Sequence, residues 1–395
     1  MNASLTVEPQ KIVLVFQGGG ALGAYQAGVF EALDRSGQDP DWVIGTSIGA
    51  INSALIAGNP PQRRLSHLSE FWRRMGDDTL ADAPVAPWSA LSQALNVAAI
   101  MTGGLKHFFR PRLSPGFAWG LDVPAGEVSY YDTAPLRDTL EELVDFTYLK
   151  RSPVRLSVGA VDIESGQMRY FDSHKETIGP EHIMASGALP PAFPPVEIGG
   201  RFYWDGGIHS NTPLEYLMQD YPRFHSLCIV ANLWQDADQL PTSLAAVQRR
   251  VKELQFASRT DTLARMEAEL HRLRHSLCVL EEHLKPDALE HEDVRRAADM
   301  GCLSVFHMIR LQAPRLEGEN QYKDIEFSPD RVFERWGAGY TAAKRALSEC
   351  RWKHPITPHD GVVLHDYAID ATAGPHEPRD RQGEPCAYKA RRPAR

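Results

Sequence analysis

The first clear element of the sequence is the segment 12–16, a continuous apolar run rich in β-branched side chains. Such a run is typical of a strand that is buried on both faces of a parallel sheet. Three glycines follow it, and residues 21–34 then place apolar side chains at helical spacing. A second short strand, 42–45, leads into a helical stretch that ends at Ala57. Two successive strand–turn–helix units predict a parallel α/β start whose turns share one sheet edge, where open α/β sheets bind their ligands.

The remaining apolar and polar pattern predicts further strands and helices of the same kind. The predicted strands are 155–161, 168–171, which pairs with it as a hairpin, 202–204, 226–233 and 304–311. The predicted helices are 181–188, 330–350 and 242–284, the last being one long charged amphipathic helix or a helical hairpin. We therefore expect an α/β sheet with a helical C-terminal region.

Proline and aromatic residues set apart an insertion at about 76–130. Its aromatic residues are Trp88, Phe108, Phe109, Phe117 and Trp119. They are equally compatible with a lipid-facing lid and with the core of the insertion. The expected organisation is an α/β domain over 1–240 with this insertion or lid, a mainly helical region over 241–370, and a disordered tail over 371–395.

Composition narrows the class of protein. The chain has 395 residues, 43% of them hydrophobic, and a formal net charge of −9, which argues against a general attraction to nucleic acid or anionic lipid. Five scattered cysteines without a C-x-x-C pair argue against a disulfide framework and a cysteine zinc site. The sequence has no signal-peptide pattern and no apolar run near the roughly 18 residues of a spanning helix. We expect a cytoplasmic protein, compatible with peripheral contact at a lipid surface.

The glycine-rich turn is the first candidate site. Residues Gly18, Gly19, Gly20 and Gly23 match G-x-G-x-x-G directly after a strand and before a helix. A dinucleotide site also needs an acidic residue at the end of the second strand, whereas Asp39 and Asp41 precede that strand. Backbone amides at a helix start suit a phosphate or a developing oxyanion, and a tight turn without a ligand is the third possibility.

The second candidate is a G-x-S-x-G turn formed by Gly45, Ser47 and Gly49. Small residues on both sides of a serine permit the strained turn that raises its hydroxyl above the sheet. Serine is also a preferred helix N-cap, so Ser47 alone supports both readings about equally. Because this serine follows only the second predicted strand, the chain does not have the order of an ordinary α/β-hydrolase.

The third candidate is Asp205, followed by Gly206 and Gly207 after the strand 202–204. Asp-Gly is a hairpin-turn signal, but a carboxylate at a strand exit can also act as the base for a serine. The histidines His209 and His307 are weaker candidates for a base, since neither lies in a strand-end motif. The pair His271 and His275 has metal-compatible spacing but no third ligand nearby, which favours a solvated helix face.

Taken together and in this order, the three motifs resemble those of the patatin-like phospholipases. The segments 185–195 and 211–213 are also similar to that family, and the resemblance covers about residues 11–235. The later segments 322–327 and 334–340 resemble a bacterial subgroup with an extra C-terminal region. Two residues depart from the family pattern: Leu22 stands where many bacterial members have Arg or Lys, and Gln17 where plant members have Asp.

The resemblance implies a three-layer α/β/α fold and a serine lipid acyl hydrolase of the phospholipase or esterase type without metal or organic cofactor. Ser47 would be the nucleophile, Asp205 the proton acceptor, and the amides of Gly18 to Gly20 the oxyanion hole. The expected partner is a lipid or other acyl ester and not nucleic acid, and the oligomeric state is open. Two alternatives stay open: acyl transfer or thioester hydrolysis at the same site, and a non-catalytic nucleotide-binding or regulatory module.

Overall fold

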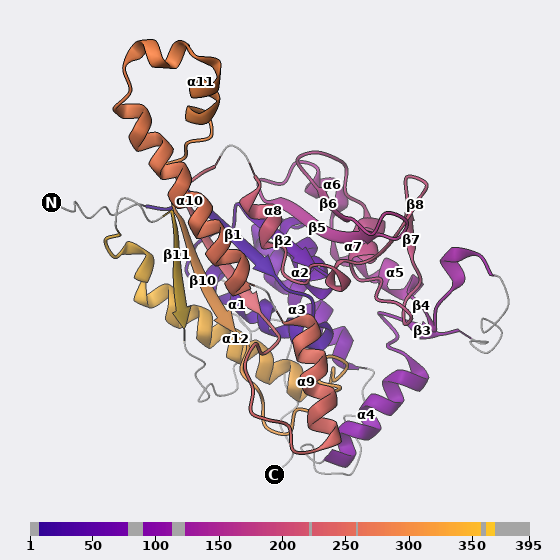
Figure 1. Ribbon diagram of the computed structural model, residues 1–395. Helices are drawn as coiled ribbons and strands as arrows, with labels where there is room; N and C mark the ends of the chain where they lie inside the picture. Colours follow the sequence, from indigo (N-terminus) through magenta and orange to yellow (C-terminus); the bar gives the residue numbers. More distant parts are fainter. Residues whose placement is uncertain are drawn as a thin grey trace.

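The computed structural model describes residues 8–77, 90–112, 123–220, 223–257, 260–356 and 361–367. A nine-stranded sheet runs through the centre of the molecule, in the order β11-β10-β9-β1-β2-β5-β8-β7, with β6 paired to β5 (Figure 1). Its strands are β1 (Lys11–Phe16), β2 (Trp42–Thr46), β5 (Arg155–Asp162), β6 (Met168–Asp172), β7 (Val196–Ile198), β8 (Arg201–Asp205), β9 (Ser226–Asn232), β10 (Phe306–Gln312) and β11 (Val362–Tyr367). Two short strands, β3 (Arg110–Pro111) and β4 (Tyr131–Asp132), form a separate pair.

The central strands are parallel. β1 pairs in parallel with β2 and β9, while β2 continues to β5 and β9 to β10 and β11. β6 and β8 are antiparallel to β5, and β7 and β8 form a hairpin. The predicted hairpin between 155–161 and 168–171 is therefore confirmed.

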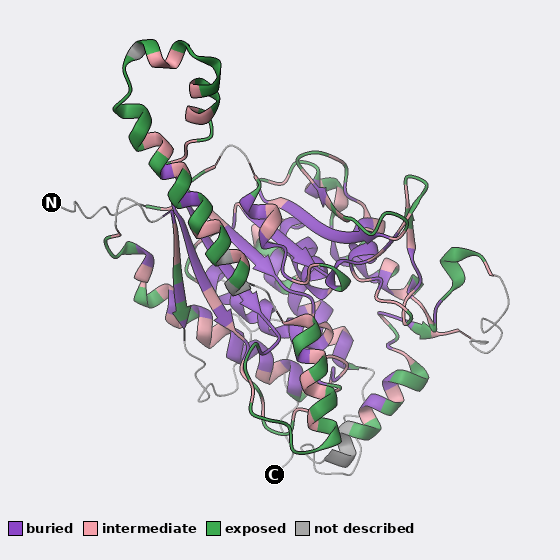
Figure 2. Ribbon diagram, in the orientation of Figure 1, coloured by how far each residue is buried: buried purple, intermediate pink, exposed green. Residues whose placement is uncertain are grey.

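Alternation along β1 builds a separate core on each face of the sheet. Leu14 and Phe16 pack into the larger core, whereas Val13 and Val15 pack into a second one. This double burial explains why the first strand has an unbroken apolar sequence rather than an alternating one. Figure 2 shows the buried residues concentrated along the sheet and the helices beside it. The predicted three-layer α/β/α fold is confirmed.

Helices from both halves of the chain cover the sheet. The larger core includes residues of α1, α2, α3 and α12, and the second core includes α8, against which α10 packs. The long helices are α1 (Ala24–Arg35), α2 (Ile48–Ala57), α3 (Pro61–Asp77), α4 (Ala90–Gly103), α5 (Ala134–Leu143), α9 (Leu244–Phe256), α10 (Thr260–Glu282) and α12 (Pro329–Glu349). The short ones are α6 (Phe146–Leu149), α7 (Pro180–Ser186), α8 (Leu214–Met218) and α11 (Glu292–Ala298).

The region after residue 240 contributes to the same sheet. β10 and β11 extend it beyond β9, and α12 packs along α1, where the Trp336 indole donates a 2.6 Å hydrogen bond to the buried Glu31 carboxylate. The predicted long helix or hairpin at 242–284 is two helices, α9 and α10, and β11 is a strand that the sequence pattern did not predict. The domain boundary at residue 240 stays a prediction, and the expected tail over 371–395 lies outside the described residues.

No helix within the described ranges has both the length and the apolar character needed to cross a bilayer.

Candidate active site

Ser47 occupies a sharp turn between β2 and α2. Its backbone has φ 57° and ψ −125°, a conformation that side-chain-bearing residues rarely adopt. The neighbouring glycines are needed for steric reasons, because a Cβ at Gly45 would collide with the backbone of Gly49, and a Cβ at Gly49 with the carbonyl of Phe16. The G-x-S-x-G pattern therefore produces a strained elbow and not an ordinary helix cap; Ser47 makes no side-chain capping hydrogen bond.

A second serine holds this elbow in place. The N–H of Ser47 donates a 3.0 Å hydrogen bond to the hydroxyl oxygen of Ser186, at the end of α7. The Ser186 hydroxyl in turn donates a 2.6 Å hydrogen bond to the carbonyl of Gly159 in β5. The strained turn is thus tied to the neighbouring strand through one buried hydroxyl.

Asp205 lies at the end of β8, and an interaction with the Ser47 side chain lowers the pKa of its carboxyl. It also accepts a 2.7 Å hydrogen bond from the N–H of Gly207, and only 2% of the residue is exposed. Burial raises the pKa of the Asp205 carboxyl to about 6, while the interactions with the Ser47 side chain and the Gly207 N–H act in the opposite direction. A carboxylate of this basicity in contact with a serine hydroxyl is suited to accept its proton.

The glycine loop lies beside this pair. The N–H of Gly18 donates to the carbonyl of Asn211 at 3.3 Å, and the carbonyl of Gly18 accepts a 2.7 Å bond from the Trp234 indole. Within the described part of the chain, the N–H groups of Gly19 and Gly20 have no hydrogen-bond partner. Two of the three expected amides are therefore available to a bound oxygen, whereas that of Gly18 already holds the loop.

Residues far along the chain fix the conformation of this loop. Gly20 has φ 54°, and a Cβ there would collide with the carbonyl oxygen of Asp324. That carbonyl accepts a 2.8 Å hydrogen bond from the N–H of Ala21. The Asp324 carboxylate receives a 2.6 Å hydrogen bond from Lys252 of α9. The C-terminal region thus forms part of the site.

A cavity of about 330 Å³ opens over Ser47 and Asp205. It is lined mainly by apolar and aromatic side chains, and Lys252 is the cation among its described lining residues. The lining comprises Gly18, Gly19, Gly20, Ser47, Ile48, Ile51, Ile100, Met101, Phe108, Phe109, Tyr130, Tyr131, Gly187, Leu189, Pro191, Ala192, Phe193, Asp205, Gly207, Asn211, Trp234, Lys252, Phe256, Asp324, Ile325 and Phe327. The volume lies in the usual range for small-molecule sites.

The aromatic residues of the insertion fall into two groups, those that the structure describes and those outside the described residues. Phe108 and Phe109 are buried in the larger core and line the cavity, where both rings pack against Phe193. Trp88 and the pair Phe117 and Trp119 lie outside the described residues.

The other residues that the sequence singled out either pack closely near the site or lie away from its cavity. A Cβ at Gly23 would crowd Ile48, and a Cβ at Gly206 would approach the carbonyl of Gly159, so both glycines permit close packing near the site. His209 is exposed and does not line the cavity, while His307 is buried beside His365 in β11. Burial lowers the pKa of His307 to about 4.

The predicted solvated face for His271 and His275 is wrong, since both side chains are buried. α10 turns these residues inward, where the His271 ring packs edge-on against Phe306. No group of three metal-ligating side chains occurs in the described ranges.

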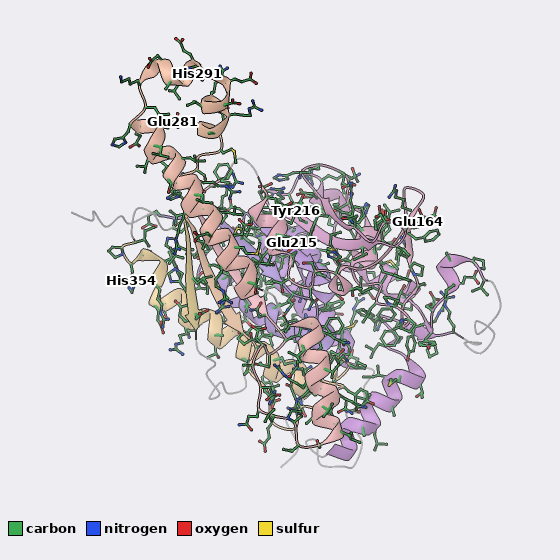
Figure 3. All side chains as sticks on the ribbon, viewed as in Figure 1. Glu164, Glu215, Tyr216, Glu281, His291 and His354 are labelled. Atoms are coloured by element: carbon green, nitrogen blue, oxygen red, sulfur yellow. The ribbon has the colours of Figure 1, made fainter. Side chains whose placement is uncertain are left out.

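A larger cavity, of about 450 Å³, lies at the opposite edge of the sheet, where the strands begin. Its main cation, Arg155, is bonded to Asp172 and Asp220 and stacks 3.8 Å from the centre of the Trp42 ring. Tyr216 on α8, labelled in Figure 3, completes this network with a 2.7 Å hydrogen bond to Asp172. The Arg155 charge is thus paired within the protein, unlike the free amides beside Ser47.

Sequence reasoning missed several residues of the site. Trp234 and Lys252 carry no local motif, and Asp324 acts mainly through its backbone. Gln17 was noted only as a departure from a family pattern, yet its side chain accepts hydrogen bonds from the N–H groups of Leu233 and Trp234. Its position at the end of β1 was the available signal, because side chains at strand exits meet at one edge.

Parts of the chain are similar to known proteins. A family model described as patatin-like phospholipase matches residues 14–218, about half of the chain, and one described as patatin phospholipase matches residues 254–359. A curated relative, the patatin-like phospholipase domain-containing protein ZK370.4 of Caenorhabditis elegans, is 25% identical over 280 residues. The match covers 68% of this chain but only 17% of that relative's length.

Two solved structures are also similar to parts of the fold. VipD from Legionella pneumophila is 15% identical with a TM-score of 0.41, and the match covers 88% of this chain and 68% of that one. The ExoU–SpcU complex from the type III secretion system of Pseudomonas aeruginosa is 17% identical with a TM-score of 0.27, covering 90% of this chain and 74% of that one.

Proposed function

Because the chain belongs to the patatin-like phospholipase family, we propose that it is a serine lipid acyl hydrolase with Ser47 as nucleophile and Asp205 as its base. The pairing of Ser47 with the buried Asp205 at the floor of one cavity carries this proposal. It joins the two groups that a covalent acyl transfer needs, a hydroxyl on a strained turn and a carboxylate of raised basicity. The apolar cavity above them fits the hydrocarbon part of an acyl ester.

In the first half of the reaction, Ser47 attacks the acyl carbonyl while its proton passes to the Asp205 carboxylate. Negative charge then develops on the carbonyl oxygen, next to the N–H groups of Gly19 and Gly20. Donors that are already oriented and unpaired cost little reorganisation when that charge appears. The proton on Asp205 next goes to the departing alkoxide, which leaves an acyl ester on Ser47.

In the second half, water takes the place of the departed alcohol. Asp205, again ionised, accepts a proton from this water as it attacks the acyl carbonyl. Collapse of the second tetrahedral intermediate returns the proton to the Ser47 oxygen and releases the fatty acid. All proton transfers use one carboxylate, which is why its pKa near 6 matters for the rate.

The setting of the glycine loop favours this chemistry over nucleotide binding. Its two free amides open into a mostly apolar cavity shared with Ser47, whereas a dinucleotide phosphate would place charge there. We therefore regard the loop as an oxyanion hole rather than a phosphate cradle.

Reaction with a fluorophosphonate, followed by peptide mapping, tests the proposal. Covalent modification should occur at Ser47, be absent in Ser47→Ala, and be strongly slowed in Asp205→Asn. Ser47→Ala should also reduce turnover of a simple ester by several orders of magnitude. Esterase activity that persists in Ser47→Ala, or labelling of another serine, would contradict the assignment. Product analysis with a lysolipid or a thiol acceptor present separates hydrolysis from acyl transfer.

A further inference from the structure

Helix α9 exposes apolar residues and turns its charged residues inward, the reverse of an ordinary surface helix. Its exposed positions are Leu244, Ala245, Val247, Gln248, Val251, Leu254 and Gln255, and none of these carries a charge. Leu240, just before the helix, extends the apolar series at the same spacing and is 91% exposed. Figure 2 shows the exposed side of this helix facing away from the body. We call Leu240, Leu244, Val247, Val251 and Leu254 the α9 stripe.

The charged residues of α9 bond to the body of the protein instead. Glu253 is fully buried and accepts a 3.0 Å hydrogen bond from Lys323. Arg249 pairs with Asp238 at 3.2 Å, and Lys252 with Asp324. These contacts fix which side of the helix faces outward, so the exposure of the stripe is imposed by the fold.

Helix α9 also borders the catalytic cavity. Lys252 and Phe256 of the same helix line that cavity, as does Met101 of α4. The whole of α4 is free of charged residues, and its Leu95 and Met101 are exposed. Tyr130 likewise lines the cavity while remaining partly exposed to solvent. The exposed Met101 and Tyr130 therefore belong to the cavity wall, and α9 borders the same cavity through Lys252 and Phe256.

We propose that the α9 stripe, with the exposed side of α4, docks the protein on a lipid surface and delivers an acyl chain to Ser47. This inference rests on the proposed function. A lipid molecule held at the exposed side of α4 meets Met101 and Tyr130 at the cavity, whereas a protein partner on this face would cover the opening. Apolar helix faces bury themselves at the boundary between headgroups and acyl chains.

The binding should depend on apolar burial and not on charge. The exposed faces of α9 and α4 are uncharged, and the protein as a whole has a net charge of −9. Adding phosphatidylglycerol to phosphatidylcholine vesicles should therefore not strengthen the binding, since the overall field opposes an anionic surface.

A pair of matched triple variants tests the proposal. The α9 variant is Leu244→Glu/Val247→Glu/Val251→Glu; none of these side chains lines the cavity. The control is the α10 variant Met266→Glu/Leu273→Glu/Leu280→Glu. It changes the same number of exposed apolar residues and the same charge on a helix that does not line the cavity. Glu281, labelled in Figure 3, marks the projecting end of this helix.

Co-sedimentation with phosphatidylcholine vesicles should show wild type and the α10 variant bound, and the α9 variant bound at least about 100-fold more weakly. Hydrolysis of vesicle lipid should fall in parallel, while hydrolysis of a water-soluble monomeric ester should be unchanged in all three proteins. Wild type that fails to bind, an α9 variant that binds normally, or equal losses in both variants would overturn the proposal. If the α9 variant instead has half the molecular mass of wild type in solution, the stripe is the contact surface with a second copy of the chain.

The binding assay does not depend on catalysis. A protein that binds through α9 but cleaves no ester would contradict the proposed function and leave the docking surface in place. A protein that hydrolyses esters but binds vesicles equally well with and without the α9 changes would contradict the docking surface and leave the proposed function in place.

Discussion

The backbone carbonyl of Asp324 accepts a 2.8 Å hydrogen bond from the N–H of Ala21, inside the turn that carries the free amides of Gly19 and Gly20. A loop from the C-terminal region therefore sets the shape of the expected oxyanion hole. The same loop places Ile325 and Phe327 in the cavity wall. The region after residue 240 thus helps to build the candidate site.

Gly20→Ala should impair catalysis more than folding. An alanine at φ 54° is strained by about 1–2 kcal/mol, and its Cβ would push against the Asp324 carbonyl and shift the amides. We expect kcat for a soluble ester to fall at least about tenfold, in the direction seen when an oxyanion donor is lost.

Gly37→Ala is the matched control for this change. Gly37 also has a positive φ, 76°, but a Cβ there would meet nothing within 4 Å. Both variants carry the strain of a positive φ, so Gly20→Ala, which adds the clash with Asp324, should lose at least as much thermal stability as Gly37→Ala, and only Gly20→Ala should lose activity. Equal kinetics in the two variants would show that the loop shape does not limit the rate.

Ser186→Ala should slow the reaction without weakening substrate binding. It removes the acceptor for the Ser47 N–H and leaves the strained elbow without its tie to β5. One lost hydrogen bond of about 1–1.5 kcal/mol corresponds to a roughly tenfold fall in kcat, with KM unchanged.

Ser53→Ala provides the comparison for Ser186→Ala. Ser53 is buried in α2, the helix that begins after Ser47, and its hydroxyl has no hydrogen-bond partner among the described residues. The two changes remove the same atom from buried sites. A kcat that is equal in both variants would mean that Ser186 only fills space.

The strand exits of the first half could be predicted from the sequence because steric rules act locally there. A continuous apolar strand followed by small residues and a serine permits few conformations, and Gly45 and Gly49 meet the steric demand directly. The contributions of Lys252 and Asp324 could not be predicted this way. A charged helix pattern normally indicates a solvated face, whereas α9 buries Glu253 against Lys323. The edge strand β11 was missed because its burial alternates irregularly.

The pH dependence of kcat/KM should reflect Asp205. A general base must be ionised, so activity should be level above the pKa of about 6 and fall about tenfold per pH unit below it. A water-soluble ester is the appropriate substrate, because vesicle binding has its own pH dependence. His307, whose pKa burial lowers to about 4, would give an inflection well below this value. A profile that is flat through pH 6 would contradict the assigned base.

Asp205→Asn should stabilise the fold at neutral pH while abolishing activity. The carboxyl has a pKa of about 6 in the folded protein and about 3.8 when unfolded, so between these values the folded state holds a proton that the unfolded state has released. Wild-type stability therefore falls as pH rises from 4 to 6, by about 3 kcal/mol at about 1.4 kcal/mol per pKa unit.

Asparagine has no such titration. Denaturant unfolding should therefore show that the free energy of unfolding of Asp205→Asn exceeds that of wild type by an amount that grows across this window and levels off above pH 7. Ser47→Ala, which removes an interaction that lowers this pKa, should extend the loss of stability to higher pH. A stability difference between Asp205→Asn and wild type that stays constant from pH 4 to 8 would mean that the carboxyl is not held in a desolvated site.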